Sequence, residues 1–300
     1  MAKLSRKTKE NIKTSVVLII VALLFTVYII YPLNNSDTLF SREDSHIIDI
    51  DSLTPNDPGV YATFGWKVDS FRVEPDAFTS LACLHLTDSL KDSIRGTVII
   101  IPSSDTDRTA YPTLIGDLIE KSYSCFIYDQ RASGLSTGSY HGFGYLETTD
   151  LQAVLSYLAF RTQIIQPLYI VGINLGGDAA MWTALEDSRI QKVIAVDPLL
   201  TSDNIIETAK ELHDSYSYPF YNSVTFWWYK MNSGFAPTYI NVEDLKPVAT
   251  NTLIITNTEN DALNELQEIS DNSKFMLRKY TDEKLSDIIL SFIDIEQPMK

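Results

Sequence analysis

The segment from Leu168 to Ala180 limits the fold of this chain more than any other. It reads Leu-Tyr-Ile-Val-Gly-Ile-Asn-Leu-Gly-Gly-Asp-Ala-Ala. Its first four residues form a short apolar run typical of a buried strand. A Gly-x-x-x-Gly-Gly turn follows, and residues 179–186 have the composition of a helix. The segment therefore predicts a buried strand that breaks sharply into a helix, with Asn174 at the centre of the turn.

This arrangement resembles the nucleophile elbow of the α/β-hydrolase family, Gly-x-Ser-x-Gly, with Asn174 in place of the nucleophilic serine. Gly172 and Gly176 stand where a sharp turn leaves no room for a Cβ atom. The elbow residue of that family has a positive φ, which asparagine adopts more readily than most residues. Its carboxamide offers hydrogen bonds but no hydroxyl or thiol that a base could activate. A dinucleotide-binding loop is disfavoured, because Asn174 would replace its second glycine.

The rest of the chain alternates between strand-like and helix-like segments. Together with the elbow, this predicts an α/β-hydrolase fold, with a mostly parallel eight-stranded sheet flanked by helices and an antiparallel first pair of strands. The expected strands are 66–73, 78–86, 96–102, 125–129, 168–171, 193–196, 253–256 and 275–277. The expected helices are 111–121, 147–160, 179–186 and 284–293.

The N-terminal segment has the pattern of an uncleaved membrane anchor. Residues 16–31 are apolar apart from Thr26, which is long enough to cross a bilayer. No small-residue cleavage site follows, as a removable signal peptide would require. Basic residues precede the apolar run: Lys3, Arg6, Lys7, Lys9 and Lys13. We therefore expect a cytoplasmic tail (1–13), a single transmembrane helix (14–33), a linker (34–60) and an extracytoplasmic domain (61–297).

Composition narrows the partners. A hydrophobic content of 45% is enough for one substantial core, and the formal net charge is −15. An acidic body repels phosphates, so no nucleic-acid partner is expected. The expected partners are the membrane and a small ligand, lipid or protein.

Residues 201–241 interrupt the alternation with a cluster of aromatic residues, and we expect them to form a cap on the domain. Trp227, Trp228 and Tyr229 are the densest part of this cluster. These rings could line an apolar pocket or dip toward the bilayer. The favoured interpretation is that they pack the cap on the core.

A second motif supports the same family. Asp129-Gln-Arg-Ala-Ser-Gly-Leu-Ser136 resembles the Asp-x-Arg-Gly-x-Gly-x-Ser segment that follows the fourth strand in the serine-aminopeptidase and monoacylglycerol-lipase-like branch. In that branch the segment forms a turn beside the active site. The match therefore predicts fold rather than activity.

The resemblance also indicates where the other catalytic groups belong. The backbone N–H groups of Ser104 and Leu175 are the candidates for an oxyanion hole. Asp261, after the seventh strand, takes the place of the catalytic acid. The catalytic histidine belongs after the eighth strand, where the sequence has Lys-Tyr-Thr-Asp at 279–282. All histidines precede Asp261 in the chain: His46, His85, His141 and His213.

Metals and cofactors are not indicated by the sequence. Cys83 and Cys125 are too few for a disulfide framework or a zinc site. In the sheet order that the resemblance implies, the two cysteines fall on neighbouring strands. They could form one disulfide bridge or remain two buried thiols, and the sequence does not decide between these alternatives.

Three hypotheses follow for function. The first is a membrane-anchored hydrolase-like protein that has lost serine hydrolysis and binds a ligand or partner at the old active-site crater, with Trp227, Trp228, Tyr229 and His141 as binding candidates. The second is an active esterase or peptidase, using either an aspartate made by deamidation of Asn174 or a displaced pair of Ser103 or Ser136 with His141. The third is a tethered domain whose surface serves assembly.

Overall fold

A computed structural model describes residues 6–31, 33–34, 61, 64–91, 93–212, 221–234, 245, 250–257, 261–269, 275–279 and 284–295. The chain divides into two compact units. The first comprises Met1–Phe40 and Ile206–Pro237, and the second comprises Ser41–Ile205 and Thr238–Lys300.

The second unit is built on one twisted sheet. Its strands among the described residues are β1 (Lys67–Val73), β2 (Leu81–Thr87), β3 (Gly96–Ile101), β4 (Tyr123–Tyr128), β5 (Leu168–Ile173), β6 (Ile190–Val196), β7 (Asn251–Ile255) and β8 (Phe275–Arg278). Their order is β1-β2-β4-β3-β5-β6-β7-β8. β1 pairs antiparallel with β2 and β2 with β4, whereas the pairs from β4 through β8 are parallel. The predicted fold class is confirmed.

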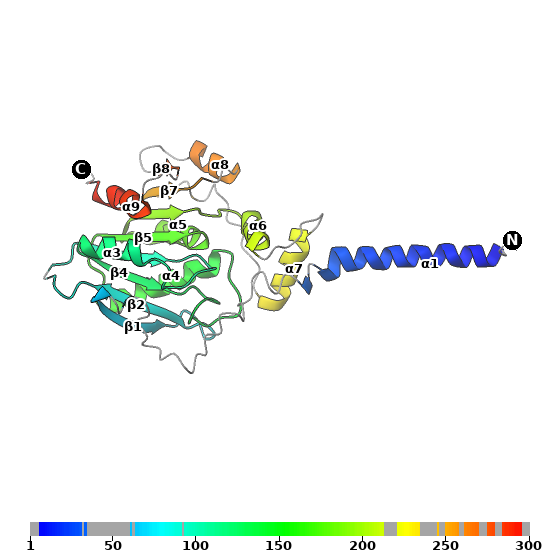
Figure 1. Ribbon diagram of the computed structural model, residues 1–300, viewed down its shortest axis with the longest axis horizontal. Coiled ribbons are helices and arrows are strands. Elements are labelled where there is room, and N and C mark those ends of the chain that lie inside the picture. Colours follow the sequence, from blue (N-terminus) through cyan, green and yellow to red (C-terminus); the bar gives the residue numbers. More distant parts are fainter. Residues whose placement is uncertain are drawn as a thin grey trace. The chain divides into compact units, whose positions relative to one another are not determined.

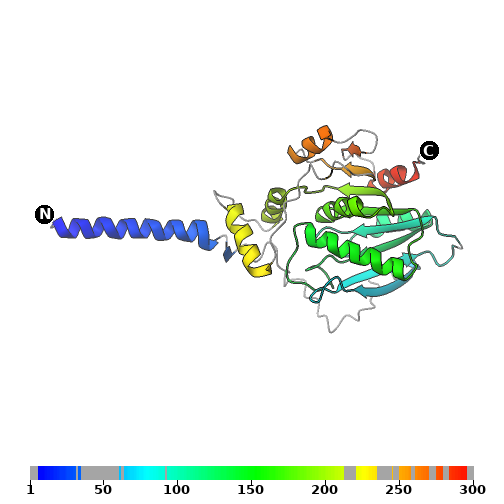
Figure 2. The ribbon, with the colours of Figure 1, turned by 180° about the vertical axis from the view of Figure 1, so that it is seen from behind.

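Helices cover both faces of this sheet, which Figures 1 and 2 show from opposite sides. One hydrophobic cluster joins the sheet to α4 (Tyr145–Phe160), α5 (Leu175–Glu186) and α8 (Asp261–Ile269). The other joins it to α3 (Pro112–Glu120) and α9 (Leu285–Asp294). β3, β4 and β5 are buried along their whole length, because helices shield them on both sides.

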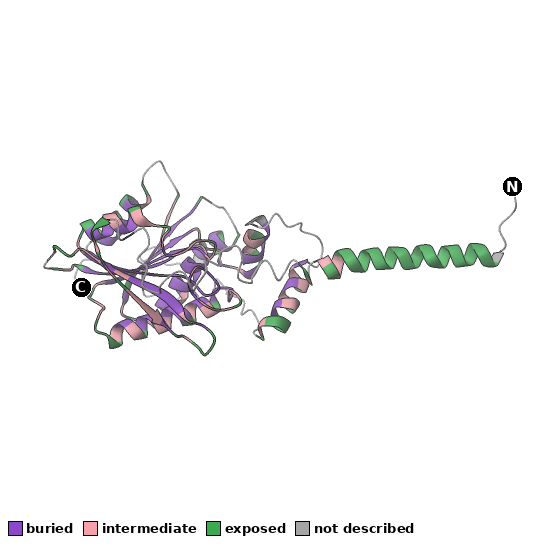
Figure 3. Cartoon of the chain, turned by 60° about the horizontal axis from the view of Figure 1, so that its bottom comes forward, coloured by how far each residue is buried: buried purple, intermediate pink, exposed green. Residues whose placement is uncertain are grey.

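The first unit contains α1 (Arg6–Phe25), η1 (Thr26–Ile30) and α7 (Tyr221–Ser233), and α6 (Ser202–Leu212) spans the boundary with the second unit. The segment Lys7–Ile30 contains an 18-residue window with a mean hydropathy of 2.4 and no buried residue, so its length and composition suit a membrane span. Figure 3 shows its exposure against the buried interior of the sheet. The helix starts at Arg6, because lysine and arginine are good helix formers and extend it ahead of the apolar residues. The bounds of the transmembrane helix, 14–33, stay a prediction.

The two cysteines are free and buried. They lie on adjacent strands, but Cys83 pairs in register with Tyr128 and Cys125 with Leu86. Cys83 belongs to the cluster on one face of the sheet and Cys125 to the cluster on the other. The possible disulfide bridge is therefore wrong, because the two sulfur atoms point to opposite sides of a sheet.

Candidate functional site

The carboxyl ends of the parallel strands meet at one edge of the sheet, and the candidate site is built there. Asn174 alone separates β5 from α5, at φ 49° and ψ −120°. Its N–H donates to the carbonyl oxygen of Val196 at 2.8 Å, and its own carbonyl oxygen accepts from the N–H of Gly177 at 2.8 Å. These bonds hold a backbone conformation that asparagine adopts at some cost. The predicted sharp turn with a positive φ is confirmed.

Two glycines allow this turn by removing side-chain atoms from its contacts. A Cβ atom at Gly172 would lie 2.1 Å from the carbonyl oxygen of Gly176. A Cβ atom at Gly176 would lie 2.7 Å from the carbonyl oxygen of Ile101, at the end of β3. Both obstacles are backbone, which cannot rotate away as a flexible side chain can. The geometry of the elbow therefore depends on glycine at these two positions.

The side chain of Asn174 is bonded to the loop after β3. Its Nδ2 donates to Oγ of Ser103 at 2.9 Å, and Ser103 is 5% exposed. A carboxamide nitrogen is not a nucleophile, because its lone pair is delocalised into the carbonyl group. This hydrogen bond joins the elbow to the loop after β3 and orients the Ser103 hydroxyl. The Ser103 contact was not anticipated from the sequence, because 71 residues separate the two positions.

The loop that carries the oxyanion-hole candidate is held by polar contacts. The carbonyl oxygen of Ser103 accepts from the N–H of Thr106 at 3.1 Å, and that of Ser104 accepts from Oγ of Ser133 at 2.7 Å. Leu175 is buried and opens α5, so its N–H has no carbonyl group one turn earlier within the helix. The pairing of the Ser104 and Leu175 N–H groups around an oxyanion stays a prediction.

The segment from 129 to 136 forms a buried turn beside this loop. The Asp129 carboxylate accepts from the N–H of Arg108 at 2.6 Å and from the N–H of Leu135 at 2.7 Å, and it also pairs with the Arg108 guanidinium. Oγ of Ser136 donates to the carbonyl oxygen of Asp129 at 2.6 Å. A Cβ atom at Gly134 would lie 2.5 Å from this carboxylate. These contacts agree with a structural role for the motif.

A second buried ion pair fixes α4 to that turn. Arg131 donates to Asp150 through Nε at 2.8 Å and through Nη2 at 2.5 Å. Burial raises the pKa of Asp150 to about 7, although the guanidinium acts in the opposite direction. Such a bidentate pair specifies geometry more than it adds stability.

The two described histidines occupy different surroundings. Nε2 of His85 lies 2.7 Å from Oγ of Ser124, and its ring stacks on Phe126 with centroids 4.0 Å apart. Burial lowers the pKa of His85 to about 4, as expected of a packed ring on β2. His141 is mostly buried, with Nδ1 3.9 Å from the Glu147 carboxylate, and burial also lowers its pKa. His46 and His213 lie outside the described residues.

The position of the catalytic acid is only partly described. Asp261 is exposed and is the first residue of α8, after a strand that ends at Ile255. Of residues 279–282, where the family's histidine belongs, the structure describes Lys279 alone. The assignment of Asp261 as the acid stays a prediction. Trp227, Trp228 and Tyr229 lie on α7 in the other compact unit, so their binding role also stays a prediction.

Asp178 is an acidic residue of the elbow helix that sequence reasoning missed. It is fully buried in the first turn of α5, and Oδ1 accepts from the N–H of Leu200 at 3.0 Å. Burial raises its pKa to about 7, although the bond from Leu200 acts in the opposite direction. The sequence did contain a signal, since Asp178 is the single charged residue among the small residues that follow the elbow.

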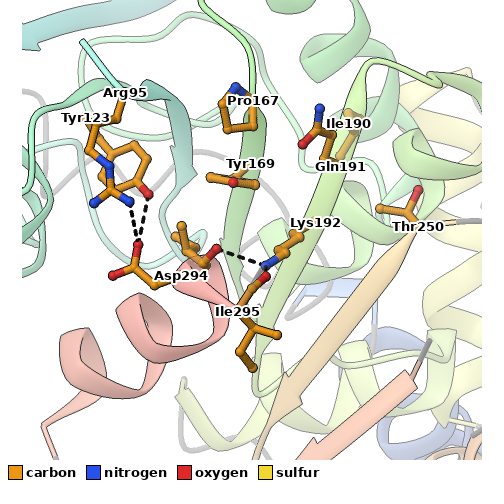
Figure 4. Close-up of a pocket in the computed structure, with 11 residues that line it drawn as sticks. Arg95, Tyr123, Pro167, Tyr169, Ile190, Gln191, Lys192, Thr250, Asp294 and Ile295 are labelled. Atoms are coloured by element: carbon orange, nitrogen blue, oxygen red, sulfur yellow. Dashed lines mark hydrogen bonds and ion pairs between the residues drawn. The ribbon is translucent and has the colours of Figure 1, made fainter. Parts of the chain in front are cut away.

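A separate cavity of about 670 Å³ opens at the amino edge of the sheet, away from the elbow (Figure 4). Lys192 lies on its wall and donates from Nζ to the carbonyl oxygens of Phe292, Ile293 and Ile295 at 2.7 to 2.9 Å. Arg95 pairs with Asp294 at 3.0 Å. These contacts bind the end of α9 to the sheet, as cations near a helix C-terminus commonly do.

The sheet order and the strand–turn–helix elbow together define a protein with the α/β-hydrolase fold. Residues 92–281, more than half of the chain, match the family described as Serine aminopeptidase, S33. The chain therefore belongs to the S33 serine aminopeptidase family. No curated protein matches it.

Solved structures agree on the fold. The esterase Pf2001 of Pyrococcus furiosus superposes with a TM-score of 0.59 at 18% identity, covering 81% of this chain and 90% of its own. The α/β hydrolase GrgF of Penicillium sp. sh18 has a TM-score of 0.54 at 15% identity, covering 76% and 96% respectively. At such identities the likeness concerns the fold alone.

Proposed function

We propose that this chain is a membrane-anchored α/β-hydrolase-fold protein that does not perform serine hydrolysis and instead binds a small ligand, lipid or protein partner at the crater around the elbow. The observation that carries the proposal is Asn174. The residue takes the backbone position of the nucleophile while its amide is bonded to Ser103. An elbow residue that keeps the turn without a hydroxyl or thiol leaves the crater able to bind but offers no attacking atom of its own for acyl transfer.

The magnitude of such a loss favours binding over turnover. In a well-studied serine protease, removing the nucleophile and the base lowers kcat by about 10⁶-fold. The rate enhancement that remains in that protease, about 10³ to 10⁴ over the reaction in water, depends on binding and on the oxyanion hole. In this chain the loop after β3 begins with Pro102, which has no N–H to donate. Residual hydrolysis is therefore expected to be slow.

Anchoring through Lys7–Ile30 is part of this proposal. The helix is long and apolar enough to cross a bilayer, and basic residues precede it. That arrangement favours a cytoplasmic N-terminus and a main domain on the other side of the membrane. Protease protection of the full chain in sealed vesicles tests this orientation, since cleavage of the α/β domain from the cytoplasmic side would contradict it.

Covalent labelling tests the absence of serine chemistry. The full chain in detergent is treated with a fluorophosphonate, beside Asn174→Ala, Ser103→Ala and Asn174→Ser variants whose folding is checked by circular dichroism. We expect no labelling of the native chain, of Asn174→Ala or of Ser103→Ala. We also expect no labelling of Asn174→Ser, because a hydroxyl without a base to activate it is a poor nucleophile. Stoichiometric labelling of the native chain that Ser103→Ala abolishes would overturn the proposal, and labelling of Asn174→Ser would show that a base is in place.

A panel of esters, thioesters and peptides then separates binding from turnover. A compound that binds and is not consumed raises the unfolding temperature, since a ligand at 100 times its Kd adds about 2.7 kcal/mol to the free energy of unfolding. Turnover of any panel member that Asn174→Ala abolishes would contradict the proposal. The active-hydrolase alternative would then stand.

A further inference from the structure

The helix α7 presents an apolar strip on its exposed side. Trp227 is 57% exposed and Met231 is 65% exposed, with Lys230 exposed beside them. Residues three or four apart share one face of a helix, so these side chains form a single strip. The opposite side of α7 carries Tyr221 and Tyr229, both buried. The helix therefore has one packed side and one open side that exposes a tryptophan.

The charge of α7 differs from that of the rest of the chain. Its sequence, Tyr-Asn-Ser-Val-Thr-Phe-Trp-Trp-Tyr-Lys-Met-Asn-Ser, contains no acidic residue and a single cation, Lys230. The chain as a whole has 39 acidic residues and a formal charge of −15. A segment free of carboxylates in such a chain can approach an anionic surface without repulsion. Tryptophan at the headgroup level with a neighbouring lysine is the composition of a membrane interface.

The position of α7 within its own unit points to the same partner. α7 belongs to one compact unit with α1 and η1. Two views from different directions place it beside the C-terminal end of that long helix (Figures 1 and 3). Tyr28 and Ile29 are half-buried there, whereas Leu18 in the middle of α1 is 63% exposed. The end of the apolar helix is where a transmembrane segment leaves the bilayer.

We propose that α7 is a second, interfacial membrane contact, in which Trp227, Lys230 and Met231 lie in the headgroup layer of the bilayer that α1 crosses. This inference rests on the anchoring proposed above. Trp227 and Met231 contribute apolar burial, and Lys230 pairs with anionic headgroups while its stem stays among the apolar groups. The contact holds the cap segment against the membrane surface.

Spin-label accessibility in nanodiscs tests the proposal on the full chain. Single cysteines are introduced by Met231→Cys, Leu18→Cys and Asn232→Cys, and each is labelled with a nitroxide. Cys83 and Cys125 are buried, so they stay unlabelled in the folded chain, which the ratio of label to protein verifies. Asn232 is the matched control, since it is also exposed on α7 but turned by about 100° from Met231.

Collision with oxygen, which concentrates in lipid, is compared with collision with a water-soluble nickel complex. We expect the label at 18 to report the bilayer interior, the label at 231 the headgroup region, and the label at 232 a more aqueous site. A lipid signal at 18 with an aqueous signal at 231 would overturn the interfacial contact and leave the anchor intact. Aqueous signals at both positions would overturn the anchor and the contact together.

Lipid composition gives a second measurement. In nanodiscs with a quarter phosphatidylglycerol, Lys230→Gln should lower the ratio of docked to undocked label at 231 about fivefold, which is the effect of one lysine near an anionic surface. In pure phosphatidylcholine the same variant should change little. A signal at 231 that depends on protein concentration instead of on lipid would identify a second copy of the chain as the partner and contradict the proposal.

Discussion

The buried carboxyl group of Asp178 leads to a pH dependence of stability that can be worked from its surroundings. Burial raises its pKa from an ordinary value of 3.8 to about 7 in the folded chain. The folded state therefore binds the proton more tightly than the unfolded state does. By linkage, the free energy of unfolding falls as pH rises from about 4 to about 7, and the loss is complete above the folded pKa.

The size of this effect follows from the two pKa values. Between pH 5 and pH 8, ionisation of this one group should lower the free energy of unfolding by about 2–3 kcal/mol. The variant Asp178→Asn has no ionisable group, and its amide oxygen can still accept from the N–H of Leu200. The difference in free energy of unfolding, Asp178→Asn minus native, should therefore rise by about 2–3 kcal/mol across this range.

Urea unfolding of the full chain in one detergent, at pH 5, 6.5 and 8, measures that difference. The control is Asp117→Asn on α3. Asp117 is partly desolvated, but its bond from the Lys284 ammonium outweighs this and lowers its pKa. A pKa lowered from 3.8 stabilises the native chain at every pH above about 4, so the difference for Asp117→Asn should stay constant between pH 5 and pH 8. A constant difference for Asp178→Asn, within about 0.5 kcal/mol, would refute the reasoning, because it would mean that the carboxylate is hydrated in the folded chain.

Three further predictions concern the framework of the site. Gly172→Ala should lower the free energy of unfolding by about 3 kcal/mol or more, because its Cβ atom meets backbone at 2.1 Å. Gly177→Ala, whose Cβ atom has its closest contact at 3.3 Å, should lower it much less. Thermal unfolding compares the two variants, and equal effects would contradict the elbow geometry. Arg131→Met should lower the free energy of unfolding by about 3–5 kcal/mol, because it leaves the buried Asp150 carboxylate without its guanidinium partner. A second change, Asp150→Leu, should recover most of that stability. A double-mutant cycle in urea tests this, and additive losses would count against a coupled pair. The buried thiol of Cys83, whose pKa burial raises, should react with a thiol reagent only after unfolding, and fast reaction in the native chain would show that β2 is open.

The elbow shows which features of the turn the fold itself requires. The turn depends on glycines at 172 and 176 and on a residue that tolerates positive φ. None of these requirements involves a nucleophile. Asparagine meets the conformational requirement, and its side chain adds a hydrogen bond to Ser103. At position 174 the fold therefore constrains the backbone conformation, whereas activity would constrain the side chain.

The sequence alone determined the local features of this protein. Alternating segments predicted the first two strands and short apolar runs predicted the others. Two glycines around Asn174 identified the elbow, because a sharp turn beside a buried strand excludes Cβ atoms whatever the remainder of the chain does. The helix after the elbow was expected only from Ala179, but it begins at Leu175. Glycine has low helix propensity, and packing against β3 and β6 overrides it.

The tertiary structure decided the contacts between residues far apart in sequence. The bond from Asn174 to Ser103, the ion pair of Asp129 with Arg108, and the separation of Cys83 from Cys125 all depend on which strands are neighbours and which face each side chain takes. Periodicity predicts that a strand is buried, but strand order and register determine what it is buried against. The burial of Asp178 and its raised pKa belong to the same class, because desolvation is a property of the assembled core and not of any single segment.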